Sequence, residues 1–267
     1  MRDAPKVVLV TGGSSGIGKA VCTRLAAEGH LVYGTSRRPQ APSDGYRMVA
    51  MDLNDGSTVG QAVAEVLAAE GRIDVVVNNA GLGIQGATED LTAAQAASLL
   101  DTNVLGAHRV CLAVLPHMRE RHHGLIINIT SLAANFGLPY RGFYSASKAA
   151  LERYTETLAM EVRPFGIHAV TLQPGEYRSN IGDNRIRPAA VSEPYRPGYQ
   201  KAMEILGGSL HYSRDPDEVG RLVLRIMAKR NPVGVYYAAH GKQRLAVLLK
   251  KVLPAGLFQR LMMKEYR

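Results

Sequence analysis

The stretch "KVVLVTGGSSGIG", residues 6–18, decides the fold of this chain. Its apolar, β-branched start predicts a buried strand, and residues 17–28 have the apolar spacing of a helix that Gly29 ends. Between them lies the glycine cluster "TGGSSGIG", Thr11–Gly18. Glycines at a strand-to-helix turn let backbone N–H groups approach a phosphate at the helix N-terminus. The stretch therefore predicts a nucleotide-binding unit, with a tight turn that binds nothing as the alternative.

The rest of the chain continues this alternation of strands and helices. Six further apolar runs predict strands, over residues 31–36, 46–53, 73–81, 124–131, 167–175 and 233–239. Helical patterns cover residues 57–71, 145–166 and 216–230, and the first of these begins with a serine. Such alternation without linkers predicts one α/β domain over residues 1–267. We expect a Rossmann-type doubly wound parallel sheet with helices on both faces.

One segment interrupts the alternation. Residues 176–214 are rich in Tyr, Arg and Pro, and no helix or strand pattern is clear there. A segment of this length inside a compact domain is usually a lid or binding loop, so we expect it to cover the substrate. Four tyrosines in it predict a partly apolar pocket: Tyr177, Tyr195, Tyr199 and Tyr212.

The overall composition excludes several classes of protein. Hydrophobic residues make up 46% of the chain and charged residues 21%, which is typical of a soluble globular protein. The first apolar run is too short for a signal peptide, and no stretch reaches the roughly 18 apolar residues of a spanning helix. Cys22 and Cys111 lie in apolar helical patterns and are interpreted as buried reduced thiols. These features predict a cytoplasmic protein, and the scattered histidines predict no metal site.

The formal net charge of +9 is concentrated in a C-terminal extension, residues 241–267, which we expect to be helical. This extension holds seven basic residues against Glu265 alone, so it supplies +6 of the net charge. It is also amphipathic, which suits peripheral contact with an anionic membrane, docking of an acidic partner, packing across a subunit boundary, or a plain solvated helix face. Nucleic acid is excluded as a partner, because aromatic residues are not interleaved with the basic ones and no binding motif is present.

Tyr144 and Lys148, in "YSASK", stand four residues apart and would share one face of a helix. Such a pair arises easily by chance, but other landmarks surround it. They are "TGGSSGIG", "NNAG" at Asn78–Gly81, Asn103 in "DTNVLGAH", Ser131 thirteen residues before the tyrosine, and "PG" at Pro174–Gly175. In this order and near these spacings, they make the chain resemble the short-chain dehydrogenase/reductase family, in particular its members that act on hydroxysteroids and retinol. The resemblance is strong over residues 5–180 and loose beyond them.

Elementary chemistry agrees with the role that the family assigns to this pair. Free tyrosine has a pKa of about 10, too high for a general base at neutral pH, and an ammonium group one turn away favours the phenolate. Tyr144 is then able to remove a proton from an alcohol or donate one to a carbonyl oxygen. Ser131, at the carboxyl end of a strand, is placed to hold the substrate oxygen. The family implies that Lys148 also holds the nicotinamide ribose, that Asn103 positions a water in the proton relay, and that subunits form homodimers or homotetramers.

The residues after the second predicted strand indicate the cofactor. NAD-binding folds usually place Asp or Glu there, whereas this chain has Arg37 and Arg38. An arginine pairs with a 2′-phosphate that an acidic side chain would repel, so we predict NADP(H), with Arg37 as the main contact. Asn78 is expected to tie its strand to its neighbours instead. The resemblance places the other cofactor contacts, besides Tyr144 and Lys148, at Gly12, Ser14, Ser15, Gly16, Ile17, Gly18, Asp52, Leu53, Asn79, Ala80, Gly81, Pro174, Gly175 and Ser179.

The leading hypothesis is an NADP(H)-dependent oxidoreductase that transfers a hydride between nicotinamide and a hydrophobic secondary alcohol, ketone or aldehyde. Family members that act on lipophilic alcohols often carry a C-terminal extension of the kind found here. One alternative is a carrier-linked 3-ketoacyl reductase whose basic extension docks an acidic carrier. Another is a regulatory protein that senses NADP(H) without turnover. The intact set of Asn103, Ser131, Tyr144 and Lys148 argues against that second alternative.

Overall fold

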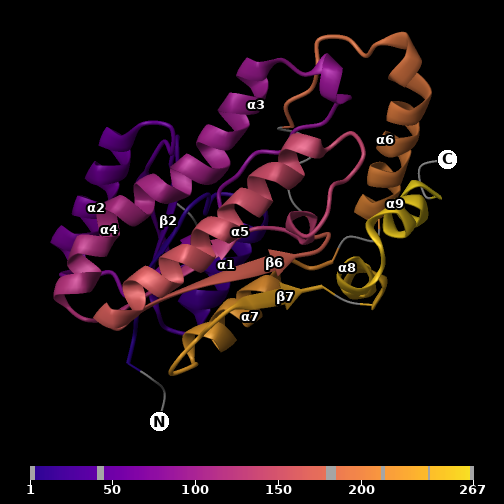
Figure 1. Ribbon diagram of the computed structural model, residues 1–267. Helices are drawn as coiled ribbons and strands as arrows, with labels where there is room; N and C mark the ends of the chain where they lie inside the picture. Colours follow the sequence, from indigo (N-terminus) through magenta and orange to yellow (C-terminus); the bar gives the residue numbers. More distant parts are fainter. Residues whose placement is uncertain (1–3, 41–44, 179–184, 212–213, 240, 265–267) are drawn as a thin grey trace.

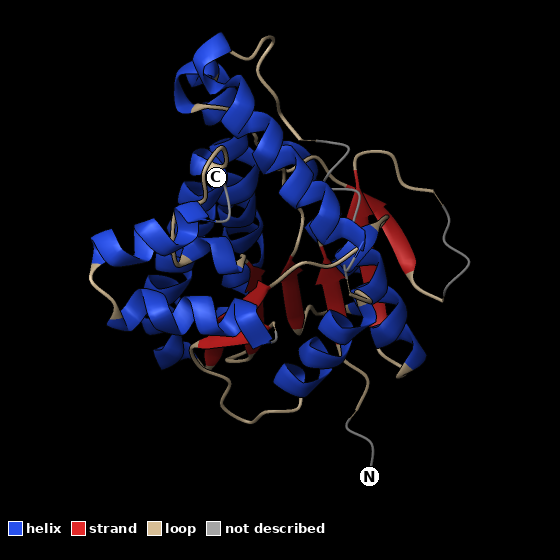
Figure 2. Ribbon diagram, turned by 90° about the vertical axis from the view of Figure 1, so that its right-hand side faces the viewer, coloured by secondary structure: helices blue, strands red, loops and turns tan. Residues whose placement is uncertain are grey.

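A seven-stranded sheet forms the centre of the computed structural model, which describes residues 4–40, 45–178, 185–211, 214–239 and 241–264. The strands are β1 (Val7–Val10), β2 (Leu31–Ser36), β3 (Arg47–Ala50), β4 (Val75–Asn78), β5 (Gly124–Ile129), β6 (Ile167–Pro174) and β7 (Val235–Ala238). They lie in the order β3-β2-β1-β4-β5-β6-β7, and every neighbouring pair is parallel. Figure 1 and Figure 2 show the sheet at the centre of the fold with helices around it. The strand order changes direction between β1 and β4, as in a doubly wound fold. This confirms the predicted fold class.

Helices cover both faces of the sheet (Figure 1). On one face, α1 (Gly16–Ala27) packs against α7 (Asp217–Met227). The other face is covered by α2 (Gly56–Glu70), α4 (Gly106–Glu120) and α5 (Gly142–Val162). A shorter helix, α3 (Ala93–Leu100), leads through a π-helical turn, Asp101–Leu105, directly into α4.

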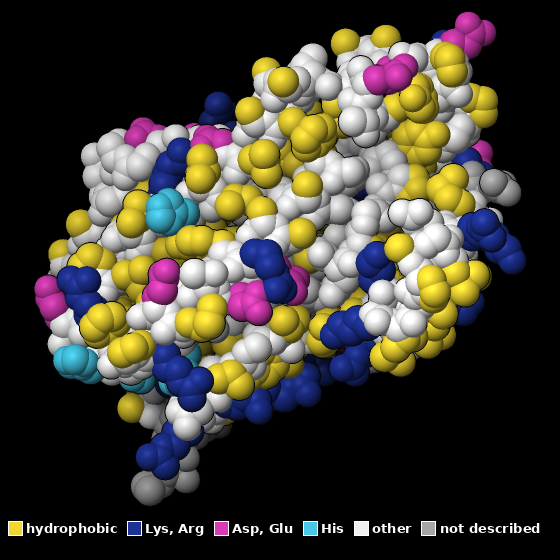
Figure 3. Space-filling model, viewed as in Figure 1, with side chains coloured by type: hydrophobic (Ala, Val, Ile, Leu, Met, Phe, Trp, Pro, Cys, Tyr) yellow, Lys and Arg dark blue, Asp and Glu magenta, His cyan; other side chains and the backbone are white. Residues whose placement is uncertain are grey.

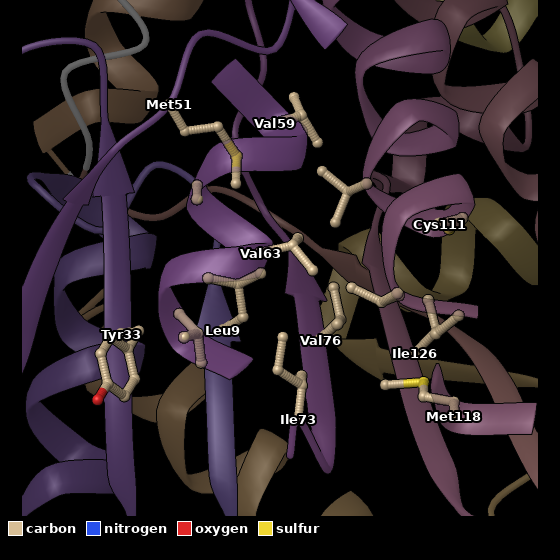
Figure 4. Close-up of a cluster of buried hydrophobic side chains, with 14 of the residues drawn as sticks. Leu9, Tyr33, Met51, Val59, Val63, Ile73, Val76, Cys111, Met118 and Ile126 are labelled. Carbon is tan, nitrogen blue, oxygen red and sulfur yellow. The ribbon is translucent and has the colours of Figure 1, made fainter. Parts of the chain in front are cut away.

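The side chains of β1 alternate between two separate hydrophobic cores. Val7 and Leu9 belong to the core beneath α2 and α4, whereas Val8 and Val10 belong to the core beneath α1 and α7. Figure 4 shows the first of these cores, where Leu9 lies among side chains of α2, β4 and β5. A strand buried on both faces needs an apolar residue at every position, which is why its sequence is continuously apolar.

Two helices begin earlier than the sequence predicts. α2 begins at Gly56 rather than Ser57, because the Asp55 carboxylate caps it and accepts a hydrogen bond of 2.9 Å from the Ser57 N–H. α5 begins at Gly142 rather than at residue 145. Tyr144 therefore lies in the first turn of α5. Because α5 follows β5, this turn stands at the carboxyl edge of the sheet, where open α/β folds bind their ligands.

The last third of the chain contains one helix in the segment where the sequence shows no clear pattern, and two helices in the predicted helical C-terminal extension. Segment 176–214 includes α6 (Arg196–His211), and β7 is followed by α8 (Gly241–Val252) and α9 (Ala255–Lys264). Figure 1 shows α6, α8 and α9 together at one end of the molecule. Pro197 lies in the first turn of α6, where its missing N–H disturbs no helical hydrogen bond. Within the ranges given above, no helix is both long and apolar enough to cross a membrane.

Asp74 ties the amino ends of β1 and β4 together. Its buried carboxylate accepts hydrogen bonds from the Val7 N–H at 2.8 Å, from Arg72 Nε at 3.0 Å and from Arg121 Nη1 at 3.2 Å. Burial by itself would raise the pKa of this carboxyl. The three hydrogen bonds and the positive charges outweigh burial and hold the pKa below its ordinary value.

Both cysteines are free and fully buried, as the sequence predicts. Cys22 lies in α1 and Cys111 in α4, each within one of the two cores. Burial raises the pKa of the Cys22 thiol to about 12 and that of the Cys111 thiol to about 11, because a thiolate would lose its hydration there.

Candidate active site

The glycine cluster forms a turn that only glycine fits at several positions. Gly12 and Gly16 have φ angles of +68° and +53°, which side-chain-bearing residues rarely adopt. A Cβ added at Gly18 would lie 2.1 Å from the Gly12 carbonyl oxygen, so the first turn of α1 presses directly on the loop. On the other side, a Cβ added at Gly13 would lie 2.6 Å from Gly34 Cα in β2. The loop is therefore packed tightly between α1 and β2, and its exposed residues are Ser14 and Ser15 at the N-terminus of α1.

The end of β4 holds this loop in place. The N–H groups of Asn79 and Ala80 each donate to Thr11 Oγ1 at 3.0 Å, and Asn79 Nδ2 donates to the Thr11 carbonyl at 2.9 Å. Ala80 also packs on Gly12, because a Cβ at Gly12 would come within 3.1 Å of Ala80 Cα. The amide of Asn79 thus shapes the loop.

Asn78 points the other way, into the protein. Its Nδ2 donates to Asn128 Oδ1 of β5 at 2.8 Å, and Asn128 Nδ2 donates to Thr155 Oγ1 of α5 at 2.8 Å. All three side chains are buried. As expected from the sequence, Asn78 ties β4 to its neighbours.

Tyr144 and Lys148 lie on one face of α5, one turn apart. The Lys148 side chain is only 4% exposed, and its Nζ donates a hydrogen bond of 3.1 Å to the carbonyl of Ile129, at the end of β5. Ser131 follows two residues later, and its Oγ accepts a hydrogen bond of 3.2 Å from the Ala133 N–H. Arg141 stacks on the Tyr144 ring, with 5.0 Å from its Cζ to the ring centre. The end of β5 and the start of α5 therefore bring Ser131, Tyr144 and Lys148 to one edge of the sheet.

The charge of Lys148 is poorly hydrated. Burial lowers the pKa of its ammonium group, and a negative charge on Tyr144 acts in the opposite direction. With water largely excluded, the ammonium and a Tyr144 phenolate interact more strongly than they would in solvent.

Asn103, in the π-helical turn before α4, is buried beside this pair. Its Oδ1 accepts from the Leu82 N–H at 2.7 Å, and its Nδ2 donates to the Leu82 carbonyl and to Ser147 Oγ, both at 3.0 Å. Gly81 lies between Asn103 and Lys148, since a Cβ there would be 3.1 Å from Asn103 Oδ1 and 3.4 Å from Lys148 Nζ. Three residues that are distant in sequence thus converge beside the glycine loop: Gly81, Asn103 and Lys148.

The family model for short chain dehydrogenases matches residues 6–188, which contain all of these features. The chain belongs to the short-chain dehydrogenase family. It is an oxidoreductase that acts on CH–OH groups with a nicotinamide cofactor, as the sequence predicts.

Relatives of this dehydrogenase are named for different substrates. A 3-ketodihydrosphingosine reductase from Bacteroides thetaiotaomicron is 40% identical over 230 residues, which cover 85% of this chain and 86% of that protein. The mouse 17-beta-hydroxysteroid dehydrogenase type 1 is 32% identical over 264 residues, with 88% of this chain and 74% of that protein covered. The crystal structure of a short-chain dehydrogenase from Streptomyces avermitilis superimposes with a TM-score of 0.84 at 31% identity. That match covers 100% of this chain and 97% of the other.

The glycine loop of this dehydrogenase fits the pyrophosphate of a nicotinamide dinucleotide. Four glycines, at positions 12, 13, 16 and 18, carry no side chain that could stand between the loop backbone and a phosphate. Ser14 and Ser15 are exposed, and the first turn of α1 contains no acidic residue that would repel a phosphate. Gly16 and Ile17 begin α1, so their N–H groups are among those without a partner inside the helix.

The carboxyl ends of β2 and β3 carry the residues predicted to select the nucleotide. Arg37 directly follows β2 and is exposed, at the same edge of the sheet as the glycine loop. Asp52 Oδ1 accepts a hydrogen bond of 3.0 Å from the Asn54 N–H, which leaves its carboxylate partly engaged in its own loop. Leu53 is buried against Gly106, where a Cβ would lie 2.9 Å from Leu53 Cβ. Their contacts with a cofactor stay a prediction.

The Pro174–Gly175 turn meets a residue that the sequence did not single out. Gly175 donates its N–H to the Ala238 carbonyl at 2.9 Å. A Cβ at Gly175 would lie 2.1 Å from Oε1 of Gln243, so this side chain of α8 rests directly on the turn. No sequence signal marks Gln243, because its place results from the chain folding back after β7. Ser179, predicted four residues after Gly175, lies outside the described residues.

The three described tyrosines of segment 176–214 make separate contacts and do not line a common pocket. Tyr177 is buried in the core beneath α7, and its hydroxyl donates to Glu218 Oε2 at 3.2 Å. Tyr195 donates to Glu89 Oε2 at 3.1 Å, and Tyr199 packs edge-to-face on Tyr140 with ring centres 5.9 Å apart. Tyr212 lies outside the described residues. Their closeness in sequence is misleading, because Tyr177 packs in the core beneath α7 while Tyr195 and Tyr199 contact Glu89 and Tyr140.

Proposed function

We propose that this dehydrogenase reduces a hydrophobic ketone or aldehyde, or oxidises the corresponding secondary alcohol, with NADP(H). The observation that supports a hydrophobic substrate best is the apolar cluster around Tyr144. Its other members come from the loop after β4, from α3 and from the turn that follows Ser131: Ile84, Leu91, Leu99 and Ala133, with Leu82, Leu138, Phe143 and Ile186 packed against them. A charged group on the substrate next to Tyr144 would lose its hydration against these apolar side chains.

The contribution of segment 176–214 supports the same proposal. Ile186 donates its N–H to the Gly83 carbonyl and accepts from the Gln85 N–H, both at 2.9 Å. Its side chain thereby joins the cluster around Tyr144. We propose that this segment acts as the substrate lid, with Ile186 as one of its apolar contacts.

The names of the two relatives agree with this class of substrate. One describes reduction of a ketone on a long-chain lipid base, and the other describes a secondary alcohol on a steroid. Both substrates carry a reactive oxygen on an otherwise apolar skeleton. Within this class we favour a 3-ketone on a long-chain lipid, because the reductase relative is 40% identical over most of both chains.

The proposed chemistry is proton transfer by Tyr144 coupled to hydride transfer. A bound nicotinamide cofactor would supply the hydride for reduction and would accept it in oxidation. Tyr144 donates its phenolic proton to the carbonyl oxygen, so that C=O becomes CH–OH, and takes the proton back in the reverse reaction. The Ser131 hydroxyl holds the same oxygen, the Lys148 ammonium stabilises the phenolate, and Asn103 orders the proton relay.

Arg37 would select NADP(H). Losing a charge-assisted pairing with the 2′-phosphate costs about 1.5–3 kcal/mol, which corresponds to a rise of about 10- to 160-fold in the KM for NADPH. We expect this rise in Arg37→Ala, with the KM for NADH unchanged. Arg38→Ala, one residue along, is the matched control and should stay within about threefold of the wild type for both cofactors. Equal effects of Arg37→Ala on NADPH and NADH would contradict the proposed preference.

The proposed substrate class is tested by NADPH oxidation with three kinds of ketone. We expect saturable turnover with a long-chain 3-ketosphingoid base, or with a 17-ketosteroid, and slow turnover with a 3-ketoacyl group on acyl carrier protein. Faster turnover of the carrier-linked substrate would favour the carrier-linked reductase. Binding of NADPH without turnover of any of the three would favour the sensor.

We also propose that subunits pair through α4 and α5, as a homodimer or as half of a homotetramer. Leu112 of α4 and Met160 of α5 are large apolar side chains that project into solvent, with 59% and 66% of their surfaces exposed. Light scattering behind a sizing column measures the mass directly. A dimer or tetramer that Leu112→Glu dissociates supports the proposal, and a monomeric wild type contradicts it.

A further inference from the structure

The two helices that end the chain form a distinct surface, which we call the C-terminal hairpin (α8 and α9, residues 241–264). Its charge is one-sided, because these 24 residues include six basic residues and no Asp or Glu. The basic residues are Lys242, Arg244, Lys250, Lys251, Arg260 and Lys264. An anionic partner would meet no like charge on the hairpin itself.

The same hairpin exposes large apolar side chains. Thirteen large hydrophobic side chains are exposed over the described part of the chain, and six of them lie in these 24 residues. They are Leu245, Leu248, Val252, Leu257, Leu261 and Met263. Figure 3 shows hydrophobic and basic side chains gathered next to each other over α8 and α9. A patch this dense is unusual on a surface that stays in water.

The apolar side chains follow the helical repeat. Leu245, Leu248 and Val252 are three and four residues apart, so they form one stripe along α8. Val247, which packs into the protein, lies two residues from Leu245 and therefore on the opposite side of the helix. On α9, Leu257 and Leu261 form a second stripe, flanked by basic residues. Each helix thus turns one face to the protein and an apolar face with basic flanks to solvent.

The hairpin is fixed to the edge of the active site. Phe258 of α9 packs on Phe136 with ring centres 5.4 Å apart, and Lys250 lies 5.4 Å from the centre of the Phe258 ring. Val247 of α8 packs with Leu132, the residue directly after Ser131. Together with the contact of Gln243 on Gly175, these anchors place the solvent-facing stripes beside the loop that carries Ser131.

We propose that the C-terminal hairpin docks on an anionic lipid bilayer. Its stripes would insert among the acyl chains at the surface, while the flanking lysines and arginines pair with lipid phosphates. A second copy of the chain is a poorer occupant, because pairing hairpin to hairpin would bring two surfaces of charge +6 together. A purely acidic protein would satisfy the basic residues and leave the apolar stripes in water.

Docking on a bilayer would bring the enzyme to a substrate that is dissolved in that bilayer. A ketone dissolved in the bilayer would enter beside Ser131 without crossing water, and this part of the inference rests on the proposed function. The docking itself does not depend on it, since the hairpin binds lipid whatever the enzyme reduces.

The test is co-sedimentation of the full chain with vesicles of 70% phosphatidylcholine and 30% phosphatidylglycerol, and with pure phosphatidylcholine vesicles. We expect binding to the anionic vesicles that is at least tenfold tighter than to the neutral ones and that weakens in high salt. Val252→Glu should weaken binding to the anionic vesicles at least tenfold. Val252 is 66% exposed, so this variant should fold as the wild type does.

Val233→Glu is the matched control. Val233 is also a strongly exposed valine (59%), and it lies before β7, at the opposite edge of the sheet from the hairpin. This variant should bind as the wild type does. A wild type that stays in solution with the anionic vesicles, or equal binding by the two variants, would overturn the proposal. A change of mass on a sizing column in Val252→Glu without vesicle binding would assign the surface to subunit contact instead.

A water-soluble ketone keeps the two proposals separate. Val252→Glu should turn it over at the wild-type rate, and should lose at least tenfold in apparent kcat/KM only for a ketone carried in the anionic vesicles. Vesicle binding with no turnover of either ketone would refute the proposed function and leave docking intact. Normal turnover of both by a protein that binds no vesicles would refute docking alone.

Discussion

Replacing Gly18 by alanine tests the idea that the glycine loop binds the pyrophosphate of the cofactor. The added Cβ would lie 2.1 Å from the Gly12 carbonyl oxygen and 2.5 Å from Asn79 Nδ2, whereas ordinary contact begins at 3.4 Å. The start of α1 and the loop must therefore separate by about 1.3 Å at this point. The Gly12 carbonyl is backbone held by its neighbours, so it has no side-chain rotation by which to move aside.

Two opposing effects set the size of the change. Overpacking of this kind costs up to about 3 kcal/mol. Alanine in place of a helical glycine gains about 1 kcal/mol. The net loss of about 2 kcal/mol corresponds to a fall in Tm of roughly 4–8 °C for a chain of this size. Because the shift also moves the N–H groups at the start of α1, we expect the Kd for NADPH to rise at least tenfold.

Thermal unfolding by circular dichroism and NADPH binding by fluorescence titration measure both effects. Gly60→Ala is the matched control, because Gly60 lies within α2 and a Cβ there meets nothing within 4 Å. This control should keep the wild-type Kd and should raise the Tm slightly. A Gly18→Ala protein with the wild-type Tm and Kd would refute the view that contact between α1 and the glycine loop determines the shape of the cofactor site.

Three further predictions concern buried polar groups. Asp74→Asn should lower the free energy of unfolding by about 2 kcal/mol at pH 7. Because folding lowers the pKa of Asp74, its contribution is present above the unfolded pKa of about 3.9 and disappears as pH falls through the folded value, so wild type and variant should converge in urea unfolding at low pH. Cys22 and Cys111 should both resist a thiol-reactive disulfide reagent until the protein is denatured, and rapid labelling of either in the native state would contradict their burial. Asn103→Ala should lower the free energy of unfolding by about 2–4 kcal/mol as well as the activity, because the Leu82 N–H and C=O lose their partner; an unchanged Tm would assign Asn103 to the proton relay alone.

The sequence predicts the sheet because each strand that is buried on both faces is marked by its own continuous run of apolar residues. Val7–Val10 are apolar at every position since both faces of β1 are covered, and the glycines after β1 are required by φ angles and close contacts that no other residue allows. The convergence of Asn103 with Lys148 was accessible only through the family resemblance. Nothing local in "DTNVLGAH" shows that Gly81 lies between them.

Features set by long-range packing were missed. Tyr177 has the same sequence surroundings as the tyrosines after it, yet α7 buries it, and α7 lies forty residues further along the chain. Gln243 reaches Gly175 only because α8 folds back over the end of β6. The start of α2 was misplaced for a simpler reason: Asp55 and Ser57 are both good capping residues, and the backbone decides which of them serves.

The central claim is that Tyr144 transfers the proton in a nicotinamide-dependent reduction. Tyr144→Phe removes one oxygen atom from a ring that is otherwise packed among apolar neighbours, so folding should be unchanged. The decisive measurement is NADPH oxidation by this variant with a saturating hydrophobic ketone, together with its Kd for NADPH. We expect a fall in kcat of about 10²- to 10⁴-fold with a Kd within about threefold of the wild type. Turnover within threefold of the wild type would contradict the assignment of Tyr144 as the general acid and base.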